Sequence, residues 1–185
     1  MRTCAIAALA LALTTPEALA VEDATKIVPS ADGRELMDAG AGLAWSRCVE
    51  GMRWDGRRCT GEARLATHAE ALALARTRSE AEGQPWRVPR VQELKRLPER
   101  LGSAQQAAAW MPDAPRGWHW TSTVRIESEA VNAYSYRNVQ RGTTERQIDR
   151  LATQTGWAVE QPGGAVRDMP KREKLPVRLV HALAR

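Results

Sequence analysis

The sequence predicts a single α+β domain with a mainly antiparallel sheet and two main helices. Short segments with strand-like alternation occur near both ends of the chain, and two segments with helical spacing of apolar residues lie between them. A run of strands that is interrupted by helices in the first half, and followed mainly by strands, favours an α+β domain. The length of 185 residues fits one domain with a substantial core.

The first 20 residues have the layout of a secretory signal peptide. Arg2 supplies a positive charge, residues 5–13 form an apolar run, and Ala18-Leu19-Ala20 is a small-x-small site, so we expect cleavage after the last of these alanines. A transmembrane anchor needs about 20 apolar residues, and a Pro-Glu pair ends this run too soon. No later segment reaches that length, so we expect a periplasmic or secreted protein without a transmembrane segment.

The mature domain begins with a predicted hairpin. Residues 21–31 are polar, so we expect a flexible lead-in before a domain that covers residues 32–185. Two short strands are then predicted at residues 34–38 and 42–45, and Ala39-Gly40 is the turn between them.

Cys48 and Cys59 bracket the next loop, in which Asp55-Gly56 is a strong turn signal. They are the only cysteines of the mature chain, because Cys4 lies in the signal peptide. An even number of cysteines in an oxidising compartment predicts a disulfide. The alternative is half of a zinc site, which needs about four ligands, and the three histidines do not have metal-ligand spacing. We therefore expect a disulfide, no metal and no cofactor.

A capping box predicts the start of the first helix. Thr67-His68-Ala69-Glu70 fits this motif, and strong helix formers continue to residue 81, before Gly83. The residues that we expect on its buried face share helical spacing: Ala69, Leu72, Ala73 and Arg76.

The second helix is predicted to follow an extended segment, Trp86-Arg87-Val88-Pro89, because the residue before a proline avoids the helical region. It starts at Arg90, and Pro98 either ends it or starts a new turn. Its inward stripe is Val91, Leu94 and Leu97. A weaker capping box predicts a short third helix over residues 103–109.

The remainder of the chain is expected to be mainly strands. Alternation predicts strands at residues 118–124, 130–139 and 175–183. Between the last two, residues 144–151 have the pattern of a short capped helix, and residues 156–159 that of a strand.

Composition limits the partners. The formal net charge is +5, which suits acidic partners such as sulfated or carboxylated glycans, anionic lipids or nucleic acids. The charges are interspersed, however, and no run of five basic residues occurs. A solvated surface is therefore the simpler interpretation, and we expect no nucleic acid partner. Seven tryptophans suit either a core with indole hydrogen bonds or a carbohydrate surface, and core packing is the commoner use.

Four short motifs follow one another along the chain. They are Gly42-Leu43-Ala44-Trp45, then Trp86-Arg87-Val88-Pro89 with Glu93-Leu94, then Trp120-Thr121-Ser122-Thr123, and finally Val177-Arg178-Leu179-Val180. Together they resemble the Lcl C-terminal domain family from residue 32 to residue 181. The resemblance implies a C-type-lectin-like fold, related to that of the formylglycine-generating enzyme. It also implies that the disulfide and the following motif residues are structural: Trp45, Trp86, Arg87, Pro89, Glu93, Leu94, Trp120, Ser122 and Arg178.

Three features depart from the family pattern. Arg90 stands where the family usually has a threonine that caps the helix, so this cap should be weaker. Thr121 replaces the first serine of the W-S-S-T motif. Residues 143–170 are longer and more polar than the last hairpin of the family, and we interpret them as an atypical insertion.

The resemblance and the export signal favour a noncatalytic binding module of the bacterial envelope or exterior. The family takes its name from a collagen-like adhesin whose end domain binds sulfated glycosaminoglycans, so acidic or sulfated glycans are the expected ligands. Side chains that can pair with sulfate or carboxylate, or stack on a sugar, lie in the cysteine loop: Arg53, Trp54, Arg57 and Arg58. For Trp54 the alternative is packing under the disulfide.

Two other functional classes remain open. One is a structural or protein-interaction component of an envelope or pilus assembly, which predicts a contiguous apolar or aromatic surface patch. The other is an enzyme, with Glu93, His119 and Asp55 as candidate groups, but these form no recognisable set of nucleophile, base and orienting group. We expect Glu93 to cap its own helix and His119 to face solvent from a strand.

Overall fold

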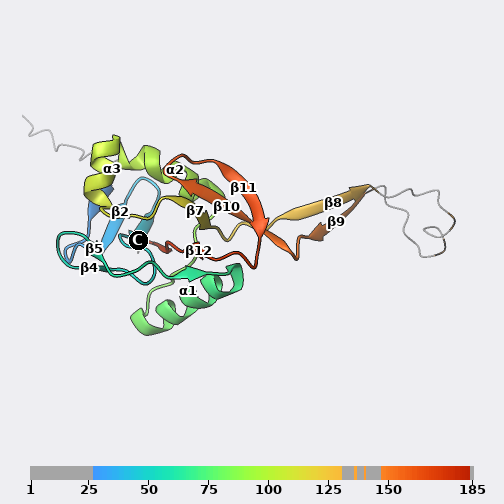
Figure 1. Cartoon of the computed structure of the whole chain (residues 1–185), viewed down its shortest axis with the longest axis horizontal. Coiled ribbons are helices and arrows are strands. Elements are labelled where there is room, and N and C mark those ends of the chain that lie inside the picture. Colours follow the sequence, from blue (N-terminus) through green and yellow to red (C-terminus); the bar gives the residue numbers. More distant parts are fainter. Residues whose placement is uncertain (1–26, 131–135, 137–139, 141–146, 184–185) are drawn as a thin grey trace, which may run out of the picture.

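The structure is a computed structural model, and it describes residues 27–130, 136, 140 and 147–183 (Figure 1). These residues form three α-helices and antiparallel strand pairs, which confirms the α+β class. The predicted signal peptide, most of the lead-in and most of the strand expected at 130–139 lie outside the described residues.

The first sheet joins the two ends of the domain. Its antiparallel order is β1 (Ile27–Pro29), β2 (Glu35–Asp38), β3 (Leu43–Ser46) and β13 (Val180–Ala182). The predicted hairpin of β2 and β3 is confirmed. Its turn is closed by the Asp38 carboxylate, which accepts a hydrogen bond from the backbone N–H of Ala41 at 3.0 Å.

The second sheet lies in the C-terminal half, in the antiparallel order β11 (Val166–Pro170), β10 (Thr155–Gln161) and β7 (Gly117–Trp120). Much of the segment that we interpreted as an insertion thus forms strands, two of them paired with the core of the domain. A short pair joins β12 (Leu175–Pro176) to β6 (Leu65–Ala66).

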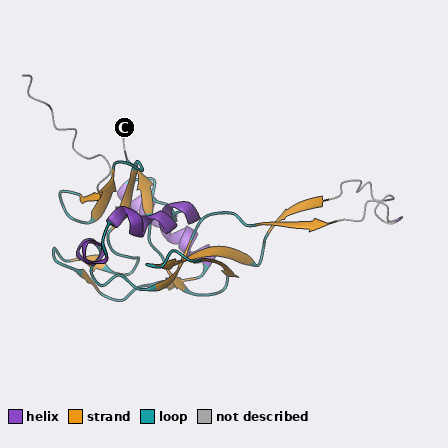
Figure 2. Cartoon of the chain, turned by 90° about the horizontal axis from the view of Figure 1, so that it is seen from above, coloured by secondary structure: helices purple, strands orange, loops and turns teal. Residues whose placement is uncertain are grey.

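A β-ribbon made of β8 (Ile126–Ala130) and β9 (Gln147–Leu151) projects away from the rest of the domain (Figures 1 and 2). The short helix predicted for residues 144–151 is therefore wrong over β9. There the backbone groups pair across the ribbon with β8, and this non-local pairing overrides a helical pattern of only a few residues.

Helix α1 (His68–Glu82) begins at the predicted capping box and ends at Gly83, which has the left-handed φ of 67°. Its predicted buried face was wrong: Ala71 and Ala75 are the buried residues, whereas Leu72 is 38% exposed. The helix is oriented by Trp86. The Arg78 guanidinium lies 4.0 Å from the Trp86 ring centroid, and the indole N–H donates to Glu82 at 2.7 Å.

Helix α2 (Val91–Leu101) continues past Pro98. Proline has no N–H, so the carbonyl of Leu94, four residues earlier, loses its helical donor. The side-chain amide of Gln161 donates to this carbonyl at 2.9 Å and replaces the missing bond. A distant residue thus makes the proline tolerable inside the helix.

The start of α2 shows how the missing threonine cap is replaced. Arg90 occupies the N-cap position and cannot accept a hydrogen bond through its side chain. Thr123 accepts one from the N–H of Val91 at 2.9 Å instead, and Glu93 accepts one from the N–H of Arg90 at 2.7 Å. Helix α3 (Ala104–Trp110) starts at the predicted capping box of Ser103 and Gln106.

Two hydrophobic clusters form the core. One joins α2 to the first sheet and contains Trp45, Leu94, Leu97 and Val180. The other lies between α1, Trp86 and the second sheet, and contains Trp120 and Leu179. Because Val180 and Leu179 are neighbours in sequence, the C-terminal segment contributes to both clusters.

Leu94 provides a test of this core. It is fully buried, so Leu94→Ala should lower the free energy of unfolding by about 2–5 kcal/mol through lost burial and a residual cavity. Leu72→Ala removes the same atoms from an exposed site on α1 and should cost less than about 1 kcal/mol. Urea denaturation measures both, and equal losses would contradict the assigned core.

Candidate functional site

The predicted binding residues lie on a disulfide-closed hairpin. Strands β4 (Arg53–Trp54) and β5 (Cys59–Thr60) pair in antiparallel fashion. The predicted disulfide forms between Cys48 and Cys59, with the two Cα atoms 5.6 Å apart. A loop of this length gains about 2–3 kcal/mol of stability from the crosslink in the chain-entropy model.

The turn of this hairpin is built by Asp55 and Gly56. The Asp55 carboxylate accepts hydrogen bonds from the backbone N–H groups of Arg57 and Arg58, at 2.8 and 2.9 Å. These two bonds hold the pKa of Asp55 below its usual value, and the bond from Arg58 has the larger effect. Gly56 adopts a φ of 100°, which a residue with a side chain rarely does. Asp55 therefore shapes the turn.

The base of the hairpin is packed tightly against the chain that follows it. Gly51 has a φ of 89°, and a Cβ atom there would lie 2.5 Å from both the backbone nitrogen of Arg64 and the backbone oxygen of Glu62. No larger residue fits without moving the backbone. The hairpin is thus held by this close approach as well as by the disulfide.

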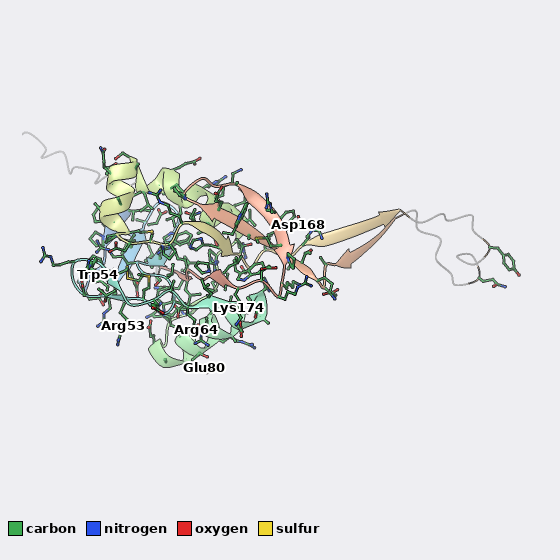
Figure 3. The ribbon with its side chains drawn as sticks, viewed as in Figure 1. Arg53, Trp54, Arg64, Glu80, Asp168 and Lys174 are labelled. Carbon is green, nitrogen blue, oxygen red and sulfur yellow. A yellow bond between two sulfur atoms is a disulfide. The ribbon has the colours of Figure 1, made fainter. Side chains whose placement is uncertain are left out.

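Three arginines of the hairpin are exposed: Arg53, Arg57 and Arg58. Figure 3 shows Arg53 and Trp54 at the same end of the molecule. Within the part of the chain that the structure describes, no carboxylate forms an ion pair with any of the three arginines. Their guanidinium groups remain available to an external anion.

Trp54 is half-buried, and its ring is covered on one side by Arg47. The Arg47 guanidinium carbon lies 3.5 Å from the ring centroid. Arg47 is itself buried, which lowers its pKa. Its Nε donates to the carbonyl of Trp110 at 2.7 Å, and its Nη1 to that of Gly33 at 3.2 Å. Trp54 therefore anchors the hairpin to the body through this cation–π contact.

Arg47 is the residue that the sequence interpretation missed. It follows β3, and no local pattern distinguishes it from the exposed arginines a few positions later. Its role depends on carbonyls at the end of α3 and before β2, both distant in sequence.

The other candidate catalytic groups have structural partners in separate elements. Glu93 forms a bidentate ion pair with Arg87, at 2.7 and 2.8 Å, and caps α2 as predicted. Burial acts to raise the pKa of Glu93, but the hydrogen bonds from Arg87 and the N–H of Arg90 hold it below its usual value.

His119 does not face solvent, which corrects our expectation. It is 1% exposed. Its Nδ1 lies 2.9 Å from the carbonyl of Gly117, and its Nε2 has no hydrogen-bond partner among the described residues. Burial, together with the charge of Arg178, lowers the pKa of His119 to about 4.

The motif residues form an internal framework. Trp45, Trp86, Leu94 and Trp120 are buried in the two hydrophobic clusters. Ser122 donates its hydroxyl to the carbonyl of Val88 at 2.9 Å, and its N–H to that of Pro89 at 2.8 Å. These contacts bind the second and third motifs to each other.

Arg178 completes this framework. It is 3% exposed, and its Nη1 donates to the carbonyls of Ser46 and Arg47, at 2.7 and 2.8 Å. It thereby fixes the chain just before Cys48, and with it the base of the hairpin.

Two features are absent from the described residues. No group of three or more His, Cys, Asp and Glu side chains is placed to hold a metal ion. No described helix is long and apolar enough to cross a membrane.

The model of the Lcl C-terminal domain matches residues 35–181. This range includes the second sheet, all three helices and the disulfide, together with the first sheet apart from β1 and the last residue of β13. No curated protein matches the chain.

His119 gives a pH prediction. The unfolded chain takes up a proton at this position near pH 6.5, whereas the folded chain does so near pH 4. Between these values the unfolded state binds more protons, so stability falls as the pH falls, by up to about 1.4 kcal/mol per pH unit. His119→Asn keeps an amide near the Gly117 carbonyl and should reduce this slope. Urea denaturation of both proteins at pH 7 and pH 5 measures how much the free energy of unfolding changes between the two pH values. An equal change in the unchanged protein and in His119→Asn would contradict a buried neutral imidazole.

Proposed function

Because the chain belongs to the Lcl C-terminal domain family, we propose that it is a noncatalytic binding module of the bacterial envelope or exterior, and that its ligands are acidic or sulfated glycans. The proposal includes a C-type-lectin-like arrangement of the fold, which the disulfide and the mixed helices and strands support. It also includes export, supported by the signal-peptide pattern of residues 1–20 and by the disulfide.

The observation that carries the proposal is the set of exposed arginines on the hairpin, Arg53, Arg57 and Arg58, none of which pairs with a carboxylate of the described chain. A guanidinium group is planar and binds sulfate or carboxylate through two parallel hydrogen bonds. The Asp55 carboxylate attracts Arg57 and Arg58 electrostatically but forms no ion pair with their guanidinium groups among the described residues, so a glycan sulfate does not have to displace an existing ion pair.

The hairpin is also preorganised. The disulfide, the Asp55 turn and the Arg47–Trp54 contact fix its backbone. Less conformational entropy is then lost when a ligand orders the arginine side chains. Arg47 already covers one face of Trp54, so only the accessible remainder of the indole is open to a sugar ring.

A charge-reversal variant tests this function. Arg57→Glu with Arg58→Glu should abolish retention on a heparin column at about 0.15 M salt, because attraction to sulfate becomes repulsion. Retention of the unchanged protein should weaken as salt rises, since ionic screening increases.

The matched control separates the hairpin from net charge. Arg76→Glu with Arg172→Glu changes the net charge equally, at exposed positions on α1 and in the turn before β12. This control should elute at a salt concentration close to that of the unchanged protein. If both double variants lose retention equally, binding follows overall charge and the hairpin has no specific role.

A second candidate function, a component of an envelope or pilus assembly, is favoured by the β8–β9 ribbon. This ribbon projects from the domain (Figure 2). Two apolar residues at its base, Val124 and Ile126, are 61% and 60% exposed. Apolar side chains that stay in solvent at the base of an extension are a suitable contact for another protein.

Substitution at the base of the ribbon tests this alternative. Val124→Asp with Ile126→Asp should remove any stoichiometric partner that co-purifies with the protein from the envelope fraction. Leu65→Asp with Leu72→Asp makes the same chemical change at exposed positions elsewhere and should keep the partner. The absence of a stoichiometric partner of the unchanged protein would count against an assembly role.

A further inference from the structure

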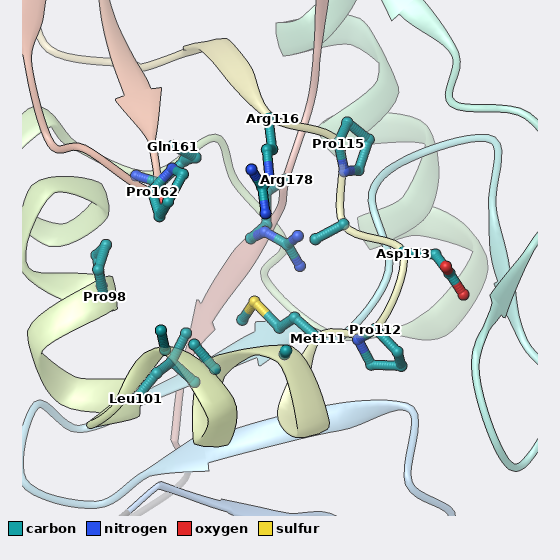
Figure 4. A pocket seen from close by; sticks show the side chains of 14 residues that line it. Pro98, Leu101, Met111, Pro112, Asp113, Pro115, Arg116, Gln161, Pro162 and Arg178 are labelled. Atoms are coloured by element: carbon teal, nitrogen blue, oxygen red, sulfur yellow. The ribbon is translucent and has the colours of Figure 1, made fainter.

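A pocket of about 470 Å³ lies between α2, α3 and the loop that precedes β7 (Figure 4). It is distinct from the arginine hairpin, since none of the hairpin residues lines it. Its wall is mostly apolar and includes Leu101, Ala108, Met111, Pro115 and Pro162. Leu101 and Met111 are each 6% exposed and belong to the hydrophobic core. The pocket therefore opens directly onto the interior of the domain.

Arg178 introduces a buried positive charge into this apolar wall. Burial lowers its pKa to about 10, so the guanidinium remains charged at neutral pH. Nη1 uses its two protons on the carbonyls of Ser46 and Arg47. The Nε and Nη2 groups have no hydrogen-bond acceptor, and no carboxylate pairs with Arg178, within the described residues. A buried charge without a counter-ion is costly.

A second cation enters the same pocket. Figure 4 shows the Arg116 and Arg178 side chains both directed into its centre, whereas the Asp113 carboxylate at the rim points away. Arg116 has no ion pair within the described part of the chain. Gln161 also lines the pocket, and its side-chain amide already donates a hydrogen bond to the Leu94 carbonyl. Two like charges thus converge where the protein supplies no neutralising group.

We propose that this pocket binds a small amphipathic carboxylic acid, whose carboxylate lies between Arg178 and Arg116 and whose apolar body packs against Leu101, Met111 and the prolines. A carboxylate has two oxygens that match the free donors of the guanidinium groups. An apolar tail matches the remaining wall, because a pocket that is mostly apolar with a few convergent polar groups is typical of small-molecule sites.

The pocket is held open by contacts outside it. Arg47 binds the carbonyls of Ala109 and Trp110 at the end of α3, at 3.3 and 2.7 Å. Gln161 joins the end of β10 to α2. These bonds fix two walls before a ligand arrives, and so reduce the ordering that binding requires.

Calorimetric titration of the purified protein with octanoate tests the proposal. We expect saturable binding with one site, and a rise in Tm with octanoate concentration. Octan-1-ol, which keeps the tail without the charge, and acetate, which keeps the charge without the tail, should each bind at least tenfold more weakly. Equal affinity for either control compound would overturn the amphipathic site.

Two variants locate the binding without disturbing the buried arginine. Arg116→Ala, at an exposed position, should weaken octanoate about tenfold or more through loss of a charged hydrogen bond, whereas Arg172→Ala, also exposed, should not. Ala108→Trp fills the pocket and should abolish binding. Ala109→Trp adds the same side chain at the neighbouring exposed position outside the lining and should retain it.

The absence of saturable octanoate binding, or octanoate binding that survives both Arg116→Ala and Ala108→Trp unchanged, would overturn the proposal. Heparin retention depends on Arg57 and Arg58, so its loss or persistence is a separate result.

Discussion

The whole domain depends on burial of the C-terminal segment, residues 177–182. Val180 pairs with Trp45 of β3 on one side and exchanges two backbone hydrogen bonds of 2.9 Å with Arg87 on the other. Val177, Leu179 and Val180 are fully buried. Val180 is therefore paired on both edges, which strongly determines its position. Because its residues enter both hydrophobic clusters, the last strand links the first hairpin to α1 and to the second sheet. The native packing of either half therefore requires the end of the chain.

Arginine has two separate uses in this protein. Buried arginines organise the backbone: Arg178 holds the carbonyls before the disulfide, and Arg47 joins α3 to the hairpin through Trp54. The guanidinium groups of exposed arginines, such as Arg57 and Arg58, form no ion pair among the described residues and favour external anions. The guanidinium group suits both uses, since it stays charged after partial desolvation and offers several donors in fixed directions. The same chemistry thus supports the hairpin proposed to bind glycans and, at Arg178 and Arg116, the pocket proposed to bind an organic acid.

Local sequence patterns predicted those features that local physics determines. The capping box at Thr67, the hairpin turn after Asp38 and the third helix at Ser103 each depend on residues within four positions of one another. The α+β class and the disulfide also followed from pattern and cysteine count. Predictions failed where contacts between residues that are distant in sequence determine the structure. Ala71 and Ala75, the buried residues of α1, share a cluster with Trp86, and residues 147–151 are a strand because β8 pairs with them. His119 is buried, and the charge of Arg178, distant in sequence, acts on it.

The candidate site likewise combines features that the local sequence determines with features that tertiary contacts determine. The sequence by itself determined that two cysteines bracket a loop rich in arginine, and that Asp55-Gly56 turns it. Only the tertiary structure decided which of these arginines are exposed to solvent. Arg47 and Arg53 belong to the same short stretch, yet one is buried against the carbonyls of α3 and the other is exposed. The pocket around Arg178 was likewise undetectable, since its walls come from segments that are distant in sequence. Burial and the presence of a counter-charge are properties of the assembled surface, and no short-range pattern encodes them.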